Sequence, residues 1–407
     1  MEVEVELGRG ARRRLEVVED PYPHVVVATR KEVVHGWSYG YRDRGRRECS
    51  AERILLNPYN GCSVGCPMCY ARGFKGYFDL WHRTGVVTVF KDFDLKCARE
   101  LDGLYVASCA YLSPITDPFQ HPLEGKYGLS ERTAYAFLDR GLPVEFVTKC
   151  GSNVPARLLD RMAENPHSFA QFTILSADDE VGRAFSPGGS TAEEQFRAVR
   201  RAADRGLYTV VRMDPLLPGL TDDRRSIEEV VARAAAEGAR HAIFSVCDLD
   251  EPWAQGTLRV VEERFPWALE AWRRVYRWRR GSRVEADVRY RRALFKLARE
   301  VCTEAGVTMA LCMEFERRGS WFRGLNEDFM TSTCCEGKET PIYYRSSLSE
   351  RFRPLEGCNG NCLACAKGLQ RPACGSRKLA EASALKLRDY RALRVSRGPT
   401  LDPYVAR

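Results

Sequence analysis

Three cysteines stand close together early in the chain, in the stretch Asn57-Pro-Tyr-Asn-Gly-Cys62-Ser-Val-Gly-Cys66-Pro-Met-Cys69. Thiolates at this spacing on one loop can bind three irons of a [4Fe-4S] cubane and leave the fourth iron open for chemistry. A zinc site would need four tetrahedral ligands, and the nearest further candidate, His82, lies in an aromatic stretch. The spacing therefore favours a catalytic iron-sulfur cluster held by Cys62, Cys66 and Cys69.

Further motifs follow these cysteines in a fixed order. They are Thr116-Asp-Pro-Phe-Gln120, Phe146-Val-Thr-Lys149, Phe172-Thr-Ile-Leu-Ser176 followed by Phe185-Ser-Pro-Gly-Gly-Ser190, and Asp214-Pro-Leu-Leu-Pro-Gly-Leu-Thr-Asp222. With these motifs the chain resembles the spore photoproduct lyase-like branch of the radical S-adenosylmethionine (SAM) superfamily, from about Asn57 to Asp222. The resemblance implies that SAM chelates the open iron and that the reduced cluster cleaves SAM to a 5′-deoxyadenosyl radical, which abstracts hydrogen from a substrate.

The resemblance, together with the chemistry of the predicted strand ends, selects five candidate SAM-binding residues. Tyr70 follows the third cysteine at the position that packs near the adenine in this superfamily, and Asp117 and Asp214 lie in the matching motifs. Lys149 ends a predicted strand in a chain that uses Arg almost exclusively, and its compact ammonium suits the SAM carboxylate. Ser176 could bind the ribose or carboxylate of SAM, although a Ser after a strand is also an ordinary cap.

Cys109 is the candidate catalytic residue, as a hydrogen-atom donor to a substrate radical. The lyases that the chain resembles carry a cysteine near this point, and a thiol S–H is weak enough to quench a carbon radical. Cys109 directly follows a predicted strand at Leu104–Ser108, but the alignment is loose because six residues separate it from the motif at Thr116. The sequence favours the alternative, a buried structural cysteine.

A second group of cysteines lies near the end of the chain. Its compact set is Cys358, Cys362, Cys365 and Cys374, and Cys334 or Cys335 could replace Cys374 if the chain folds back. The spacing of the first three repeats that of the early cysteines, so we favour an auxiliary [4Fe-4S] cluster over tetrahedral zinc. Either would couple metal binding to the folding of a segment with few core-forming residues. The lyases that the chain resembles carry one cluster, which puts their DNA-repair reaction in doubt for this chain.

The hydrophobic pattern predicts an α/β fold, a partial or full TIM-type (β/α) barrel with its chemistry at the carboxyl ends of the strands. Predicted strands are Leu104–Ser108, Pro143–Thr148, Ala170–Leu175, Tyr208–Met213, His241–Val246 and Val307–Leu311, and predicted helices are Ser130–Asp139 and Thr191–Arg205, each with a hydroxyl cap. We expect an N-terminal extension over 1–50, the barrel over 51–318 with a charged helical insertion at about 249–299, and a loop-rich, Cys-rich domain over 319–407.

Charge and composition bear on partners and location. The net charge is +8, and arginines cluster at Arg12–Arg14, Arg42–Arg47 and Arg273–Arg291. Such runs could bind the phosphates of tRNA or DNA, and they are also typical of solvated helix faces. The N-terminus has no apolar stretch long enough for a signal peptide or a membrane span, so we expect a cytoplasmic protein without membrane contact. An electron donor such as a ferredoxin or flavodoxin is the expected partner.

Three functions remain open at this point. The favoured one is a radical SAM enzyme that abstracts hydrogen from a nucleic-acid or nucleoside-like substrate, in modification or repair. The second is the same chemistry on a peptide or protein side chain, with the tail as a docking module. The third is a non-catalytic metal-binding protein that presents arginines to nucleic acid.

Overall fold

The computed structural model describes residues 1–37, 49–276, 278–280, 283–368, 372–376, 379 and 385–395. Its centre is a seven-stranded sheet in the order β16-β12-β11-β10-β9-β8-β4, and every neighbouring pair is parallel. The strands are β4 (Arg53–Leu56), β8 (Cys109–Leu112), β9 (Val144–Thr148), β10 (Phe169–Thr173), β11 (Tyr208–Leu216), β12 (His241–Val246) and β16 (Thr308–Leu311). Because β4 and β16 are the two edges of this sheet, the barrel is partial, which confirms the predicted fold class.

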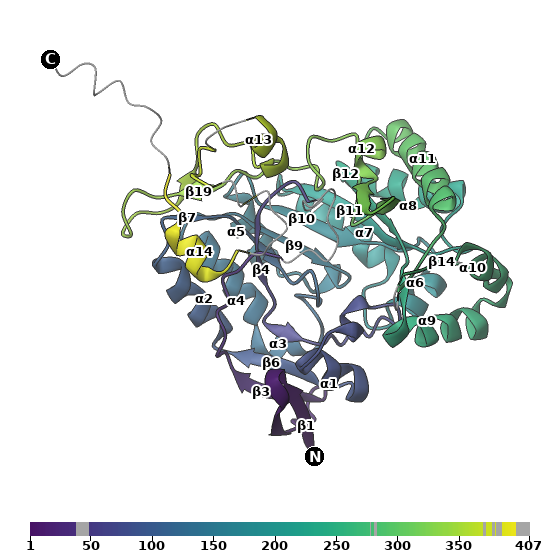
Figure 1. Cartoon of the computed structure of the whole chain (residues 1–407), viewed down its shortest axis with the longest axis horizontal. Coiled ribbons are helices and arrows are strands. Elements are labelled where there is room, and N and C mark those ends of the chain that lie inside the picture. The colour runs from purple at the N-terminus through teal and green to yellow at the C-terminus, as the bar shows by residue number, and fades with distance from the viewer. Residues whose placement is uncertain are drawn as a thin grey trace.

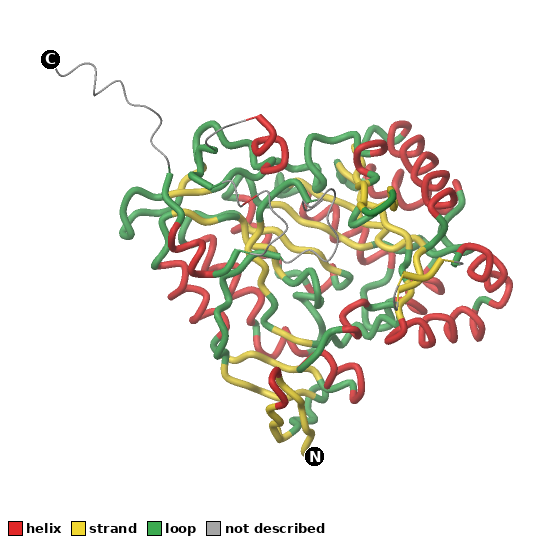
Figure 2. The backbone as a smooth tube through the Cα atoms, in the orientation of Figure 1, coloured by secondary structure: helices red, strands yellow, loops and turns green. Residues whose placement is uncertain are grey.

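Helices connect successive strands, as parallel pairing requires (Figures 1 and 2). Between β8 and β9 lie α3 (Leu123–Tyr127) and α4 (Leu129–Leu138), and α5 (Ala156–Ala163) leads to β10. Next along the chain come α6 (Asp179–Phe185), α7 (Ala192–Ala203), α8 (Arg224–Ala236) and α11 (Val288–Glu304). These helices cover the outer face of the sheet with apolar side chains, so the sheet buries one face against helices and turns the other inward.

The strands alternate between these two faces with the period of two that β-structure imposes. On β4, Ile54 and Leu56 belong to the main apolar core, whereas Arg53 and Leu55 line the interior cavity. On β8 the core residues are Ala110 and Leu112, and Tyr111 faces the cavity. The inward face of the barrel is therefore much more polar than the outward face.

The predicted strands agree with the observed ones except at the first. His241–Val246 is reproduced, and four others are shifted by a few residues at their ends. The predicted strand Leu104–Ser108 is wrong, because the run divides at Ser108. Before Ser108, β7 (Val106–Ala107) pairs with β19 (Tyr343–Tyr344) of the tail, and the barrel strand β8 begins only at Cys109, outside the predicted range.

One predicted helix cap is confirmed and the other is not. Thr191 caps α7 and accepts a hydrogen bond from the Glu194 N–H, while the Glu194 carboxylate accepts one from the Thr191 N–H. Ser130 was predicted to cap α4, but the helix begins one residue earlier, after Gly128. The Ser130 N–H instead donates to the Glu124 carboxylate, so that buried carboxylate takes the place of a cap.

The chain before β4 adds strands to one end of the barrel. A hairpin of β1 (Glu2–Leu7) and β2 (Ala11–Glu16) precedes β3 (His24–Ala28), and β3 pairs with β6 (Val87–Lys91), which also pairs with β5 (Tyr59–Asn60). The helices α1 (Tyr77–Thr84) and α2 (Phe93–Asp102) flank β6 in sequence. In Figure 1 this N-terminal region lies at the end of the molecule opposite α13 (Cys362–Gly368) of the tail.

The predicted helical insertion ends earlier than expected. It comprises β13 (Leu249–Asp250), α9 (Glu251–Arg264), α10 (Leu269–Val275), β14 (Trp278–Arg280) and β15 (Arg283–Glu285), with β15 pairing between the other two strands. The long helix α11, predicted as part of this insertion, leads directly into β16 and is the helix of the last βα unit. After β16 the tail forms a hairpin of β17 (Phe315–Arg318) and β18 (Trp321–Gly324), then α12 (Asn326–Phe329), β19, β20 (Arg353–Pro354), α13 and α14 (Leu387–Ala392).

Candidate active site

A cavity of about 580 Å³ runs into the barrel from the carboxyl ends of the strands. Its lining includes all three early cysteines, Cys62, Cys66 and Cys69, so the loop that carries them closes one end of the cavity. Lys149 follows β9 and Asp214 lies near the end of β11, and both line the same cavity. The structure thus brings together the predicted cluster ligands and four of the five predicted SAM-binding residues, because Tyr70 and Asp117 line the cavity as well.

The cysteine loop is held on one side by the Ser-Pro-Gly-Gly-Ser motif. The Gly188 N–H donates to the Val64 carbonyl at 2.9 Å, and a Cβ on Gly188 would lie 2.5 Å from the Ser63 carbonyl oxygen. Ser186 of the same motif places its hydroxyl 3.6 Å from the Cys66 sulfur. Glycine is required at position 188 because the two backbones approach too closely for any side chain.

The opposite side of the cysteine loop is held by the Thr-Asp-Pro-Phe-Gln motif. Gln120 accepts a hydrogen bond from the Ser63 N–H at 3.0 Å and donates to the Gly61 carbonyl at 3.4 Å. The Asp117 N–H donates to the Cys62 sulfur at 3.4 Å. Two motifs distant in sequence therefore fix the same loop. This positioning explains why these motifs accompany the three cysteines.

Burial controls the protonation of the cysteine thiols. Desolvation, reinforced by the nearby Asp117, raises the pKa of Cys62 well above its usual value. Desolvation, and then the neighbouring Cys66, raises the pKa of Cys69 to about 11, although the charge of Lys149 opposes the shift. Without metal both thiols stay protonated at neutral pH, so cluster assembly must displace protons from this loop.

Lys149 lies among groups that a cofactor would meet. Its positive charge favours ionisation of Cys69, Asp117 and Asp214, which places the ammonium between the cysteine loop and the end of β11. Among the described residues, the ammonium has no hydrogen bond or ion pair. A free cation beside the cluster loop fits the predicted role of binding the SAM carboxylate.

Asp117 organises the site through its own neighbours. Its carboxylate accepts hydrogen bonds from the Thr148 hydroxyl at 2.8 Å, the Lys149 N–H at 2.6 Å and the Phe119 N–H at 3.0 Å. Burial nevertheless raises the pKa of this carboxyl. Since these donors occupy the carboxylate, Asp117 joins the end of β9 to the loop after β8 and presents its backbone N–H to Cys62.

Asp214 belongs to an inward-facing polar group with Arg212 and Ser245. Arg212 donates to Asp214 through Nη2 at 2.5 Å, and the Ser245 hydroxyl donates to the other carboxylate oxygen. Burial opposes ionisation, but Arg212 and Ser245 together hold the pKa of Asp214 below its ordinary value. Arg212 also donates to Gln171 at 2.8 Å, so its guanidinium is bound to partners inside the barrel.

The remaining predicted site residues fall in different places. Tyr70 lines the cavity and donates its hydroxyl to the Pro114 carbonyl at 2.9 Å. Ser176 is outside the cavity lining, and its hydroxyl accepts a hydrogen bond from the Asp178 N–H at 3.0 Å in the turn before α6, whose cap is Asp178. Its role toward SAM is therefore not supported by this geometry.

The structure corrects the position predicted for Cys109. It is the first residue of β8 rather than the residue after a strand, and it is fully buried and outside the cavity lining. Its thiol donates to the Ala110 carbonyl at 3.4 Å. Lying beneath Tyr111 at the amino end of the strand, Cys109 matches the buried structural cysteine that the sequence favoured, and the structure does not bring it to the cavity.

Other features of the lining fit a bound cofactor. The Thr116 hydroxyl is buried on the cavity wall and has no hydrogen-bond partner in the structure. Ser113 and Met313, which follow β8 and β16, line the cavity with positive φ of 49° and 56°, in the region that side chains rarely adopt. Strained backbone of this kind is typical of functional sites, and an orphaned hydroxyl is satisfied by a ligand. The residues present therefore fit a [4Fe-4S] cluster with SAM.

The inserted segment covers the outside of the cysteine loop. Met68, between the second and third cysteines, belongs to an apolar cluster that includes Leu217, Phe265 and Trp272. Trp253 of α9 lies 3.1 Å from where a Cβ of Gly73 would stand. The insertion therefore shields from water the loop that would carry the cluster, which sequence patterning alone did not show.

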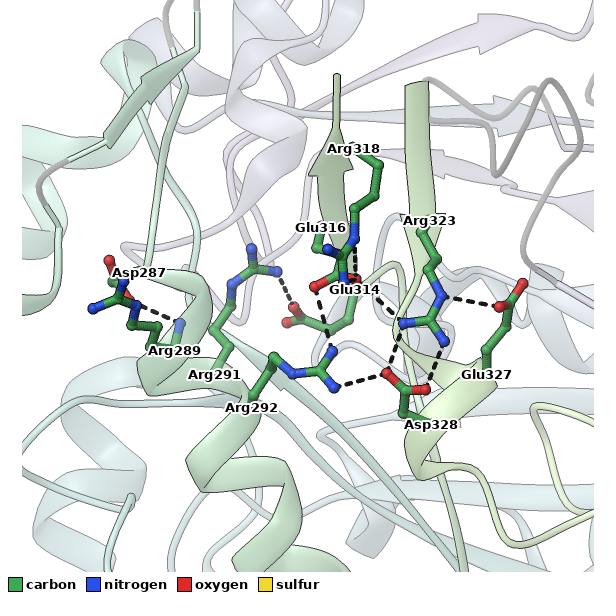
Figure 3. A network of polar contacts seen from close by, with 10 residues as sticks. All are labelled: Asp287, Arg289, Arg291, Arg292, Glu314, Glu316, Arg318, Arg323, Glu327 and Asp328. Carbon is green, nitrogen blue, oxygen red and sulfur yellow. Dashed lines mark hydrogen bonds and ion pairs between the residues drawn. The ribbon is translucent and has the colours of Figure 1, made fainter. Parts of the chain in front are cut away.

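A buried ion pair joins the cavity wall to the helix α11. Glu314 lines the cavity, accepts from the Val246 N–H at 2.7 Å and pairs with Arg291 of α11 at 2.7 Å. Burial raises the pKa of Glu314 to about 7, although Arg291 opposes the shift. Figure 3 shows the pair beside a larger network of charged residues on α11, the β17–β18 hairpin and α12.

This network bears on the predicted nucleic-acid contacts. Arg292 pairs with Glu316 and Asp328, and Arg323 pairs with the same two carboxylates (Figure 3). In the N-terminal hairpin, Arg12 pairs with Glu4. These described arginines therefore pair with carboxylates within the fold. The predicted run Arg42–Arg47 lies outside the described residues.

The tail cysteines divide between two places. Cys358, Cys365 and Cys374 are electrostatic neighbours, and burial raises the pKa of the last two. Cys362 begins α13, and its N–H donates to the Ser50 carbonyl at 2.7 Å. In the described part of the chain, no three Cys, His, Asp or Glu side chains converge closely enough to hold a single metal ion. A second cluster stays a prediction.

Cys335 lies beside Cys49 in the structure. Its side chain hydrogen-bonds with Cys49, and both line the barrel cavity. The Cys49 thiol donates to the Cys335 sulfur, which lowers the pKa of Cys335 to about 7 although burial opposes the shift. Cys335 and Cys362 both donate a backbone N–H to Ser50, to its hydroxyl and its carbonyl respectively, so the assignment of Cys335 to the tail cluster stays a prediction.

Residues 56–232 match the model of the radical SAM superfamily. These residues are therefore a radical SAM domain, and that family implies a [4Fe-4S] cluster and SAM. No helix in the described residues is long and apolar enough to span a membrane.

The chain is similar to several known proteins. The radical SAM Nα-GlyT isomerase of Pseudomonas phage M6 is 29% identical over 393 residues, covering 91% of this chain and 78% of that protein. An uncharacterised protein of Mycobacterium tuberculosis is 27% identical over 201 residues, which span 46% of this chain and 56% of that protein. Spore photoproduct lyase complexed with dinucleoside spore photoproduct has a TM-score of 0.49 at 18% identity, covering 71% of this chain and 82% of that chain.

Several cavity residues were not singled out from the sequence. They are Arg53, Tyr111, Arg212, Ser245, Cys312, Glu314 and Glu336. Alternation on the strands was a usable signal for some of them, because Arg212 and Asp214 must share a face, as must Ile243 and Ser245. Glu314 and Glu336 follow the barrel, and no local pattern marks them.

Proposed function

We propose that this enzyme abstracts a hydrogen atom from a nucleic-acid or nucleoside-like substrate and modifies it by rearrangement. The observation that carries the proposal is the single cavity that joins the three-cysteine loop to Lys149 and to the polar barrel interior. The similarity to an isomerase over 91% of the chain supports a rearrangement as the outcome. The net charge of +8 favours a substrate group that is part of an anionic polymer.

The three cysteines would hold the cluster, and Lys149 with Thr116 would bind SAM. When bound, these groups supply a 5′-deoxyadenosyl radical. The two glycine- and glutamine-bearing motifs keep the loop fixed, and the insertion keeps water from it. Tyr111 has no hydrogen-bond partner among the described residues, so its hydroxyl is available to a substrate in the cavity.

The charged residues in the cavity indicate which part of the substrate can enter it. Arg53 pairs with Glu145 at 2.8 Å and Glu336 at 2.7 Å, and Arg212 pairs with Asp214. Within the described lining, Lys149 is the cation without such a partner. Because a phosphate needs an unpaired cation to replace its water, we infer that an uncharged group such as a base enters and that phosphates stay outside.

The tail is proposed to hold a second [4Fe-4S] cluster at Cys358, Cys362, Cys365 and Cys374, and an external ferredoxin or flavodoxin is proposed to deliver electrons. Part of the tail packs against the amino ends of the strands, since His241 Nε2, at the start of β12, lies 3.3 Å from the Cys335 carbonyl oxygen. The catalytic loop lies at the carboxyl ends. The two clusters would therefore occupy opposite ends of the barrel.

The test is SAM cleavage by the anaerobically purified, cluster-loaded and dithionite-reduced protein. We expect 5′-deoxyadenosine to form faster with nucleosides or oligonucleotides than with peptides, and oligonucleotide binding to weaken steeply with salt. Stimulation by peptides alone would favour the peptide function instead. A protein that never forms 5′-deoxyadenosine, or whose Cys62→Ala variant cleaves SAM equally well, would refute the radical mechanism.

A further inference from the structure

The cavity wall carries a second set of thiols, separate from the cluster loop. Cys49 precedes β4, Cys312 follows β16, and Cys335 comes from the tail, and all three line the cavity. Since β4 and β16 are the unpaired edges of the sheet, these thiols lie where the barrel is open. The side chains of Cys49 and Cys335 hydrogen-bond to one another, and Cys312 is an electrostatic neighbour of Cys49.

Several contacts hold Cys335 in place against the segment before β4. The Ser50 hydroxyl donates to the Cys335 sulfur at 3.4 Å and accepts from the Cys335 N–H at 3.1 Å. The next residue, Glu336, pairs with Arg53 at 2.7 Å. These contacts join two segments that are 285 residues apart in sequence. The two thiols are therefore kept together by buried polar contacts rather than by chance proximity.

A close approach on the other side of Cys335 also limits its movement. Gly337 has a φ of +71°, and a Cβ there would lie 2.4 Å from the His241 ring. Both Cys49 and Cys335 are only partly buried, so a small reagent in the cavity can reach them. The pair thus combines fixed geometry with access, which are the two conditions for thiol–disulfide exchange.

We propose that Cys49 and Cys335 form a reversible disulfide that fastens the tail to the chain before β4. The oxidant is a low-molecular-weight disulfide of the glutathione type. One thiolate attacks it, releases one thiol and forms a mixed disulfide, and the second protein thiol then displaces the other half as a thiol. Two protein thiols are oxidised and one disulfide is reduced to two thiols, with the protons retained on the released thiols.

The bond would link the chain before β4 to the tail across the gap between β4 and β16. The tail would then be covalently tied to the chain before β4 when the surroundings are oxidising, a condition in which reduced iron-sulfur chemistry cannot run. The inference does not depend on which substrate the enzyme uses. It also gives Cys335 a role that excludes cluster ligation, because a sulfur in a disulfide is not a thiolate ligand.

The test uses the cluster-loaded protein, incubated anaerobically with glutathione disulfide and mapped by non-reducing peptide mass spectrometry. We expect a linked Cys49–Cys335 peptide pair that dithiothreitol removes, with the visible absorbance of the cluster unchanged. Alkylation of Cys49 and Cys335 by iodoacetamide should fall at least tenfold in the oxidised protein. In the Cys49→Ser variant, Cys335 should carry a single glutathione, and the control Cys302→Ser, altered at a fully buried site on α11, should behave as wild type.

Three results would overturn the proposal. Cys335 could remain unmodified while iron content shows a second cluster, which would make it a ligand. Cys335 could link to Cys312 instead of Cys49, or the Cys312→Ser variant could lose the linkage, which would make Cys312 the true partner. Unchanged alkylation of Cys49 and Cys335 after the incubation would show that the bond does not form.

Discussion

The N–H of Gly188 donates a hydrogen bond to the carbonyl oxygen of Val64, and this contact fixes the middle of the cysteine loop against the end of α6. A Cβ at position 188 would approach the Ser63 carbonyl to 2.5 Å and the Val64 Cα to 2.9 Å. Because backbone atoms are the obstacle, the loop or the motif must shift to make room.

We expect the Gly188→Ala variant to bind much less iron, measured as iron and sulfide per chain after anaerobic reconstitution. Forcing this contact costs about 1–3 kcal/mol, typical of overpacking, and displaces the cysteines from one another. The matched control is Gly182→Ala, on α6, where a Cβ meets nothing within 4 Å. Equal iron content in the two variants would show that the clamp does not position the cluster.

Lys149 is expected to contribute a charge-assisted hydrogen bond to bound SAM. Replacing it in Lys149→Gln should weaken SAM binding by about 10- to 100-fold, because such bonds contribute roughly 1.5–3 kcal/mol. Equilibrium dialysis with cluster-loaded protein measures the change. Lys149→Arg should restore little, since the larger planar group does not fit the place of a compact ammonium.

Lys91 is a suitable control for that experiment. It is exposed at the end of β6 and lies outside the cavity lining, so Lys91→Gln should bind SAM as wild type does. Loss of iron in Lys149→Gln would have to be excluded first by metal analysis. Unchanged SAM affinity in a fully loaded Lys149→Gln protein would contradict the assignment.

The barrel could be predicted from sequence because its strands are apolar runs separated by amphipathic helices. His241–Val246 was reproduced because it is apolar on both faces and bounded by a turn. The run from Leu104 to Leu112 was misplaced because its first part pairs with Tyr343–Tyr344 of the tail. Such pairing between distant segments leaves no mark in the local pattern.

The candidate site, like the barrel, could be predicted from the sequence only in part. Cys62, Cys66 and Cys69 could be predicted because cluster ligands on one loop have a fixed spacing. Cys335 was grouped with the tail cysteines by nearness in sequence, whereas its neighbour in space, Cys49, comes from the start of the chain. The spacing of ligands on one loop can be seen in the local sequence. The pairing of two thiols from distant segments depends on the fold and cannot.

The Arg291–Glu314 ion pair predicts a stability change that depends on pH (Figure 3). Burial raises the pKa of Glu314 to about 7, above its ordinary value of 4.5. In Arg291→Ala this pKa rises further, because the opposing cation is gone. A raised carboxyl pKa stabilises the folded state at low pH, and this contribution is lost as pH rises through the folded pKa.

We therefore expect Arg291→Ala to cost little stability at pH 6 and progressively more above pH 7, with a limiting slope of about 1.4 kcal/mol per pH unit. Urea unfolding at several pH values measures this slope. The control is Arg225→Ala, whose exposed pair with Glu229 should contribute little to stability at any pH. A cost for Arg291→Ala that is the same at pH 6 and pH 8.5 would contradict the titration of Glu314.

The thiol of Cys335 should react with alkylating agents at lower pH than an ordinary cysteine. Its pKa is lowered to about 7 because the Cys49 thiol donates a hydrogen bond to its sulfur, and the thiolate is the reactive form. The alkylation rate in the reduced protein should therefore rise through pH 7 and level off by about pH 8, one pH unit above this pKa. In Cys49→Ala the profile should shift to higher pH, since the stabilising donor is lost. Peptide mass spectrometry of timed iodoacetamide reactions gives both profiles, and an unshifted profile in Cys49→Ala would show that the hydrogen bond does not control this thiol.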